Sequence, residues 1–168
     1  MAVRRAAGHI LVGFGVAMGL AAGAFPKTTF AATDGPFAIL NGAWTGSGQI
    51  RLASGSAEAL KCKAYYTPKE GSSALGLAIR CASASSKIEL RANLVAQGGR
   101  VSGNWEERTF NASGEVSGQT NGNRLTLNIV GGGFSGTMSV STNGGSQTVN
   151  ITTTGIGLQG VNISLSRG

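Results

Sequence analysis

Few residues of this sequence are of the types that carry out acid–base, nucleophilic or metal chemistry, and their spacing keeps them apart. The single histidine, His9, lies in an apolar N-terminal region, so no Ser-His-Asp or Cys-His arrangement can form beyond that region. Glu106 and Glu107 are adjacent carboxylates, but neighbours on a strand point to opposite faces and cannot act on one bond. We therefore expect no catalytic residue, no metal site and no cofactor.

Two cysteines, Cys62 and Cys81, are the remaining reactive side chains. A hairpin centred near residues 71–72 would place them opposite each other, where a cross-strand disulfide is geometrically reasonable. In an oxidising compartment an even number of cysteines is expected to pair, which leaves no thiolate to bind zinc. The bridge would close a loop of about 20 residues and stabilise the fold by about 3 kcal/mol. Two buried free thiols are the alternative.

The N-terminus has the three-part order of a secretory signal peptide. Arg4 and Arg5 form a basic start, an uncharged apolar run follows from about residue 10 to 24, and small residues come next. The run is short for a membrane helix, which needs about 20 residues, although an uncleaved anchor is the alternative. We expect residues 1–32 to be removed by cleavage near 31/32, or after 24, and the product to reach the periplasm, the cell surface or the extracellular space.

Removal of the signal peptide lowers the net positive charge of the chain, which bears on whether it binds nucleic acid. The full chain has a net charge of +7, but 11 Lys and Arg and all 7 acids lie beyond residue 32, which leaves +4. These cations are scattered rather than clustered, so the sequence does not predict a nucleic-acid interface. We expect contact with a membrane only through the signal peptide, and a monomer.

Beyond residue 42 the sequence predicts an all-β domain. Turn residues recur about every 8 to 14 positions, and apolar residues alternate with polar ones between them, which is typical of antiparallel sheets with one buried face. Asn-Gly steps suit tight hairpin turns. We predict an antiparallel meander of about 8–10 strands that closes into a small barrel, with a β-sandwich as the alternative, and a flexible stretch over 33–41 before a single domain over 42–168. The expected strands cover residues 43–52, 57–66, 74–82, 87–96, 100–107, 113–120, 124–130, 134–141, 146–153 and 159–166.

Four side chains are candidates for a rim or ligand contact in such a barrel. Tyr65 and Tyr66 are adjacent on one strand, so one of them faces inward and the other outward. If Trp105 faces the core, Glu107 shares that face and could lie at the rim. We expect Trp105 and Phe110 to be core residues.

The first and last predicted strands carry a pattern that resembles the calycin proteins, the lipocalins and avidins. Gly42-Ala-Trp44 opens the first strand, and Arg167 ends the last one. In calycin barrels the tryptophan plugs one end and the basic side chain packs across its ring, so the resemblance implies a structural pair of Trp44 and Arg167. The segment from Phe37 onward also resembles small exported proteobacterial proteins of unknown function.

These observations favour a non-catalytic binding module over an enzyme. A closed barrel of this size can hold one small apolar ligand in its interior. The first alternative is a protein-interaction module, such as an inhibitor of an exported enzyme or an envelope accessory protein. The second alternative is an outer-membrane or surface structural protein.

Overall fold

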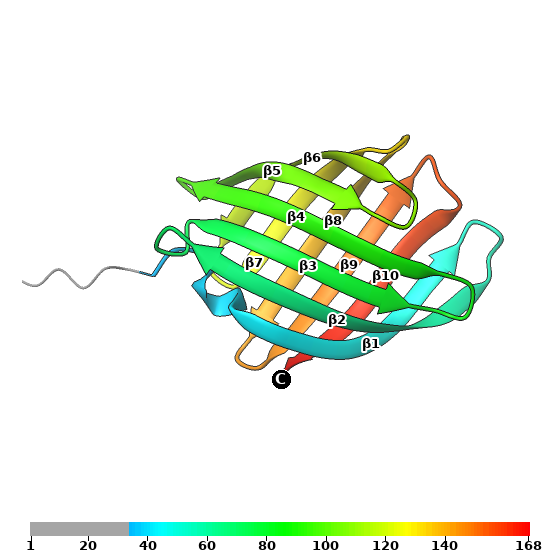
Figure 1. Cartoon of the computed structure of the whole chain (residues 1–168), viewed down its shortest axis with the longest axis horizontal. Helices are drawn as coiled ribbons and strands as arrows, with labels where there is room; N and C mark the ends of the chain where they lie inside the picture. The colour runs from blue at the N-terminus through cyan, green and yellow to red at the C-terminus, as the bar shows by residue number, and fades with distance from the viewer. Residues whose placement is uncertain (1–33) are drawn as a thin grey trace, which may run out of the picture. The chain divides into compact units, whose positions relative to one another are not determined.

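The structure, a computed structural model, describes residues 34–168 and consists of ten strands preceded by one short 3-10 helix, η1 (Ala38–Leu40) (Figure 1). The signal peptide predicted over residues 1–32 lies outside the described residues. No helix within residues 34–168 is both long and apolar enough to span a membrane. The strands are β1 (Gly42–Leu52), β2 (Ala57–Lys69), β3 (Ala74–Ala82), β4 (Lys87–Gln97), β5 (Arg100–Glu107), β6 (Ala112–Asn121), β7 (Arg124–Gly131), β8 (Phe134–Asn143), β9 (Ser146–Thr154) and β10 (Leu158–Arg167).

The ten strands form one closed antiparallel barrel. Each strand pairs with the next along the chain, and β1 pairs with β10, so the sheet has no free edge. This confirms the predicted meander, and the β-sandwich alternative is wrong. The predicted strands match closely, the largest difference being at the end of β2, which continues to Lys69. The predicted hairpin register also holds, since Cys62 lies opposite Cys81 and Tyr66 opposite Leu77.

Strict alternation of burial shows how the sequence forms these strands. In β7, Leu125, Leu127 and Ile129 are buried, whereas the residues between them are exposed. The same period of two runs through most of the strands, which places apolar side chains inside the barrel and Ser, Thr, Asn and charged side chains outside. The interior of the barrel is therefore the hydrophobic core of residues 34–168.

Glycines at inward positions let the strands bend enough to close the barrel. A side chain on Gly46 in β1 would collide with the carbonyl oxygen of Ser164 in β10, and one on Gly103 in β5 would collide with that of Asn93 in β4. At both positions the neighbouring backbone occupies the space that a β-carbon needs. Glycine at such corners is a common way for a sheet to turn sharply.

The barrel has a closed end and an open end. We call the end at which β1 begins and β10 finishes the closed end; η1 lies there (Figure 1). The opposite end, with the turns after β1, β3, β5, β7 and β9, is the open end. The expectation that 33–41 is flexible is wrong for residues 34–41, because Phe37 and Leu40 are buried and the Phe37 N–H donates to the carbonyl of Ser72. This segment seals the closed end.

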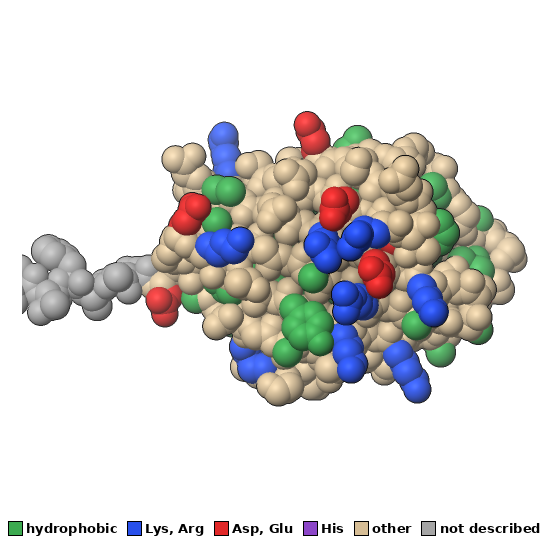
Figure 2. Space-filling model, in the orientation of Figure 1, with side chains coloured by type: hydrophobic (Ala, Val, Ile, Leu, Met, Phe, Trp, Pro, Cys, Tyr) green, Lys and Arg blue, Asp and Glu red, His purple; other side chains and the backbone are tan. Residues whose placement is uncertain are grey.

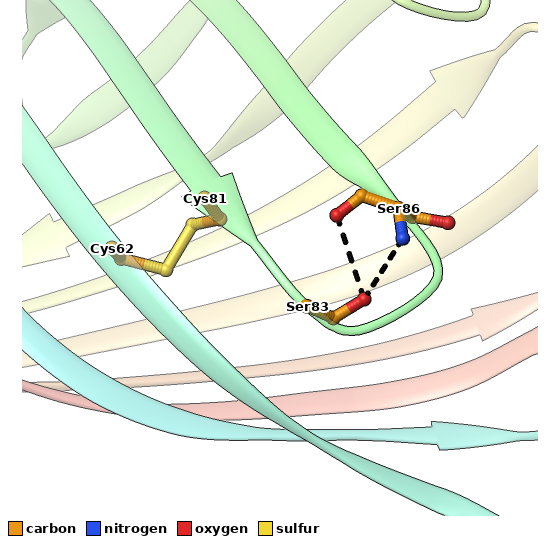
Figure 3. Close-up of a disulfide and its surroundings, with 4 residues drawn as sticks. All are labelled: Cys62, Cys81, Ser83 and Ser86. Carbon is orange, nitrogen blue, oxygen red and sulfur yellow. Dashed lines mark hydrogen bonds between the residues drawn. A yellow bond between two sulfur atoms is a disulfide. The ribbon is translucent and has the colours of Figure 1, made fainter.

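Cys62 and Cys81 form a disulfide between β2 and β3 (Figure 3). The two residues are a cross-strand pair with Cα atoms 4.1 Å apart, and both are buried in the barrel interior. The turn that follows β3 is held separately, since the Ser86 N–H donates to the Ser83 hydroxyl oxygen at 3.1 Å. The bridge therefore links two strands that the hairpin already pairs.

Replacing both cysteines, in the variant Cys62→Ala/Cys81→Ala, should lower the free energy of unfolding by about 3 kcal/mol. The disulfide restricts the unfolded chain across a separation of 19 residues, and this restriction is lost in the variant. Urea unfolding followed by tryptophan fluorescence measures the change. Reductant should destabilise the wild type and leave the double variant unaffected; equal stability of the two proteins would contradict the expectation.

Candidate functional site

The closed end is organised around Trp44, which is fully buried. Its indole Nε1 donates a hydrogen bond to the Leu40 carbonyl at 2.8 Å, which ties η1 to the first strand. The guanidinium carbon of Arg167 lies 4.4 Å from the centre of the Trp44 ring, and the guanidinium also donates to the carbonyls of Asn41 and Ile39. Trp44 and Arg167 are directly paired across β1 and β10, so this contact lies at the seam where the barrel closes.

A buried polar chain completes the closed end. The Tyr66 hydroxyl donates to Gln147 Oε1 at 2.7 Å, and Gln147 Nε2 donates to the Thr142 hydroxyl at 3.3 Å. Burial raises the pKa of Tyr66 well above its ordinary value, against the smaller opposing effect of the Gln147 bond, so Tyr66 stays a neutral donor. Gln147 and Thr142 were not among the predicted site residues, although the inward positions of Thr142 on β8 and Gln147 on β9 were a signal in the sequence. Tyr66 has a structural role here, away from the open rim.

Arg167→Met should lower the free energy of unfolding by about 2 kcal/mol, because it removes two charge-assisted hydrogen bonds and the cation–π contact while keeping a long apolar stem. Thermal and urea unfolding measure the loss. Arg124→Met is the matched control, since Arg124 is an exposed residue at the same end and should tolerate the change. Equal losses in the free energy of unfolding for the two variants would contradict this role of Arg167.

The open half of the barrel presents apolar side chains that are only partly covered. These residues pack against the core but keep part of their surface exposed, whereas other apolar side chains of the same half, such as Ile50 and Leu60, are buried. A group of apolar side chains that stays partly exposed in a folded domain often marks a surface that contacts a ligand or a partner. The set comprises Leu52, Ile79, Ile88, Leu90, Phe134, Ile151 and Leu158. We call these seven residues the apolar mouth.

Trp105 contributes an aromatic wall to this half. It is buried, and its ring lies 5.4 Å from that of Phe134, centre to centre, in a tilted arrangement. Its Nε1 donates to the Val130 carbonyl at 3.4 Å, which fixes the orientation of the indole. Of the four candidate contact residues, Trp105 and Glu107 thus lie inside the barrel toward the open end.

Glu107 lies at the open rim and holds the turn between β5 and β6. It is 8% exposed, and its two carboxylate oxygens accept hydrogen bonds from the N–H groups of Glu89 (2.7 Å) and Phe110 (2.6 Å). Burial raises the pKa of Glu107, but the backbone donors, with Thr109, outweigh burial and lower its pKa below the ordinary value. This carboxylate is therefore an ionised anchor for the turn, with its acceptor capacity directed at the backbone.

Two aromatic residues point away from the interior. Tyr65 is 47% exposed on the outer face of β2, beside a shallow hollow of about 740 Å³ that Arg91 and Asn104 also line. Phe110 is 65% exposed in the turn after β5, so the expectation that it is a core residue is wrong. Glu107, three residues earlier, accepts a hydrogen bond from the Phe110 N–H in this turn. Tyr65, Tyr66, Trp105 and Glu107 thus occupy three different regions and do not form one site.

No group of three or more His, Cys, Asp or Glu side chains within residues 34–168 is placed to hold a metal ion. At the closed end, the hollow beside Phe37 and Leu125 has a volume of about 10 Å³, which is about the space of one water. Wider hollows of about 810 and 450 Å³ lie on the outer surface near the same end, beside Arg100 and Asp34 respectively.

The pH dependence of stability should reveal the role of Glu107. Because its pKa is lower in the folded than in the unfolded state, it stabilises the fold above the unfolded pKa of about 4.3, and this stabilisation is lost as the pH falls through the folded pKa. Urea unfolding of the wild type and Glu107→Gln should therefore differ most at neutral pH and converge in acid. Glu106→Gln, on the exposed outer face, is the control. A difference that stays constant with pH would contradict this role.

Known proteins that resemble this chain share its fold, at a low sequence identity. No protein-family model and no curated protein matches the sequence. Among solved structures, the chain is similar to Rv2717c from M. tuberculosis, with a TM-score of 0.65 and 14% identity over 78% of this chain and 94% of that one. It is also similar to the S-type phycobiliprotein lyase CPES from Guillardia theta, with a TM-score of 0.53 and 15% identity over 79% and 90% of the two chains.

The barrel, its meander order and these neighbours define the fold: a closed antiparallel β-barrel. The particular protein is a ten-stranded version of that fold, with one end sealed by a tryptophan and an arginine and with an apolar mouth at the other end. At this level of identity the likeness extends to the fold alone.

Proposed function

We propose that this barrel is a non-catalytic binding module that takes a small apolar ligand at its open end. The observation that carries the proposal is that more apolar side chains are partly exposed at the open end than at the closed end. At the closed end Phe37, Leu40 and Trp44 are buried, and two apolar side chains, Ile39 and Leu77, stay partly exposed. At the other end the seven residues of the apolar mouth stay partly exposed. An apolar ligand seated there would cover this surface and gain about 25 cal/mol for each Å² of apolar area removed from water.

The polarity of the two barrel surfaces supports this function over an outer-membrane role. Thr126, Asn128, Thr148 and Asn150 are exposed on the outer face, while the interior is apolar. An outer-membrane barrel needs the opposite arrangement, with an apolar band facing lipid and a polar interior. A calycin-like fold is also compatible with ligand binding, since barrels of this class hold small molecules in their mouths.

The search for the ligand starts with native mass spectrometry of the protein purified from its own host, to detect a co-purified small molecule. Affinity is then measured by titration with a fluorescent long-chain fatty acid. Leu158→Arg should weaken this binding at least about tenfold, because the substitution places a charge beside the apolar mouth.

Val95→Arg is the matched control for that titration. Val95 is 50% exposed on the outer face of β4, near the closed end, so the same substitution there should leave fatty-acid binding unchanged. Circular dichroism and thermal unfolding establish that both variants fold. Equal affinity of Leu158→Arg and the wild type, or the absence of any binding by the folded wild type, would count against an apolar ligand at the open end.

A further inference from the structure

We propose that the open end of the barrel docks on a bilayer of anionic phospholipid, and that the apolar ligand enters from this bilayer. The second half of this proposal rests on the proposed function; the docking does not, and it is tested separately. The sequence analysis expected membrane contact only through the signal peptide. The charges and the exposed apolar side chains of the barrel indicate a second contact.

The first observation is a group of cations near the open end. Neighbouring outward positions on β2, β3 and β4 carry these side chains, because the register places Lys63 opposite Arg80 and puts Ala82 between Lys61 and Lys87. They surround a shallow hollow of about 550 Å³ whose lining includes one acidic residue, Glu89, which is 3.7 Å from Arg80. We call Lys61, Lys63, Arg80 and Lys87 the basic patch.

The second observation is that charge is confined to one side of the barrel. Residues 125–166, which form most of β7 to β10, contain no Lys, Arg, Asp or Glu. Figure 2 shows blue side chains along the opposite face, which β1 to β5 form, with most of them over the centre and the open-end half and with red side chains among them. All seven acidic residues also lie outside residues 125–166, but the lining of the hollow has four cations and one acidic residue, Glu89. An anionic surface would therefore attract the barrel with the basic patch toward it.

The third observation is that exposed apolar side chains flank the basic patch around the open rim. Phe110, in the turn between β5 and β6, is 65% exposed, and Ile156, in the turn between β9 and β10, is 39% exposed. In the strand order of the barrel, the turns above the basic patch lie between these two turns. The Glu107 carboxylate holds the Phe110 N–H at 2.6 Å, so the ring is presented by an anchored turn.

Cations beside projecting apolar side chains are the combination that suits a bilayer surface. Lysine and arginine bind the anionic headgroups, while phenylalanine and isoleucine enter the boundary between headgroups and acyl chains. An acidic polymer in solution would engage the basic patch but would gain little from Phe110 or Ile156. The same orientation brings the apolar mouth toward the acyl chains, which is where an apolar ligand would be found.

The experiment uses residues 34–168, which belong to one compact unit with a hydrophobic core, because the apolar N-terminal run would bind lipid by itself. Co-sedimentation is measured with vesicles of equal parts phosphatidylglycerol and phosphatidylcholine, and with phosphatidylcholine alone. We expect binding to the anionic vesicles that falls with added salt. Lys61→Gln/Lys63→Gln should weaken it about fivefold for each lysine. Phe110→Asp should weaken it further.

Arg100→Gln/Arg124→Gln is the matched control, since it removes the same charge from exposed positions at the closed end. Equal losses for the two double variants, equal binding to both vesicle types, or no binding by the folded wild type would overturn docking through the basic patch. If folded Phe110→Asp binds vesicles as the wild type does, and the wild type binds soluble heparin tightly, the partner of the basic patch is an acidic polymer instead of a bilayer.

Leu158→Arg separates docking from ligand binding. If it keeps vesicle binding and loses the fluorescent fatty acid, both proposals are supported. If the wild type binds vesicles but takes no fatty acid, the proposed function fails while docking stands. If fatty acid binds and vesicles do not, docking fails while the proposed function stands.

Discussion

The pairing of β1 with β10 is the constraint on which the rest of the structure depends. It turns a linear meander into a barrel without free edges, and it brings Trp44 and Arg167 together at the closed end. The guanidinium in turn bonds the carbonyls of Asn41 and Ile39, so the same seam holds the segment that seals this end. Sealing one end leaves the other as the place where apolar surface is exposed.

The fold could be predicted because its signals are local. Alternation of the kind seen at Leu125, Leu127 and Ile129 fixes which face of a strand is buried, and Asn-Gly steps mark the turns between strands. The burial of Phe37 and Leu40 was not predictable in this way. These residues follow Asp34-Gly-Pro, which is typical of a loop, and their partners, such as Ser72 and Leu125, are distant in the sequence.

The candidate site was less accessible to sequence reasoning because it depends on which end of the barrel each residue occupies. Phe110 has a residue type that predicts burial, yet its position in a turn that Glu107 anchors exposes it. Gln147 has a type that predicts exposure, yet its register places it against Tyr66. The basic patch consists of four cations from three strands, so it is scattered along the sequence and gathers only when the strands pair.

The pairing of the first strand with the last affects how fast this protein can fold. Strand β1 pairs with β2 and with β10. Two segments more than a hundred residues apart in the chain must therefore meet before the core is enclosed. Contacts at such separation make folding slow, because a long loop must be closed first. Until then the growing chain carries an unpaired, apolar edge.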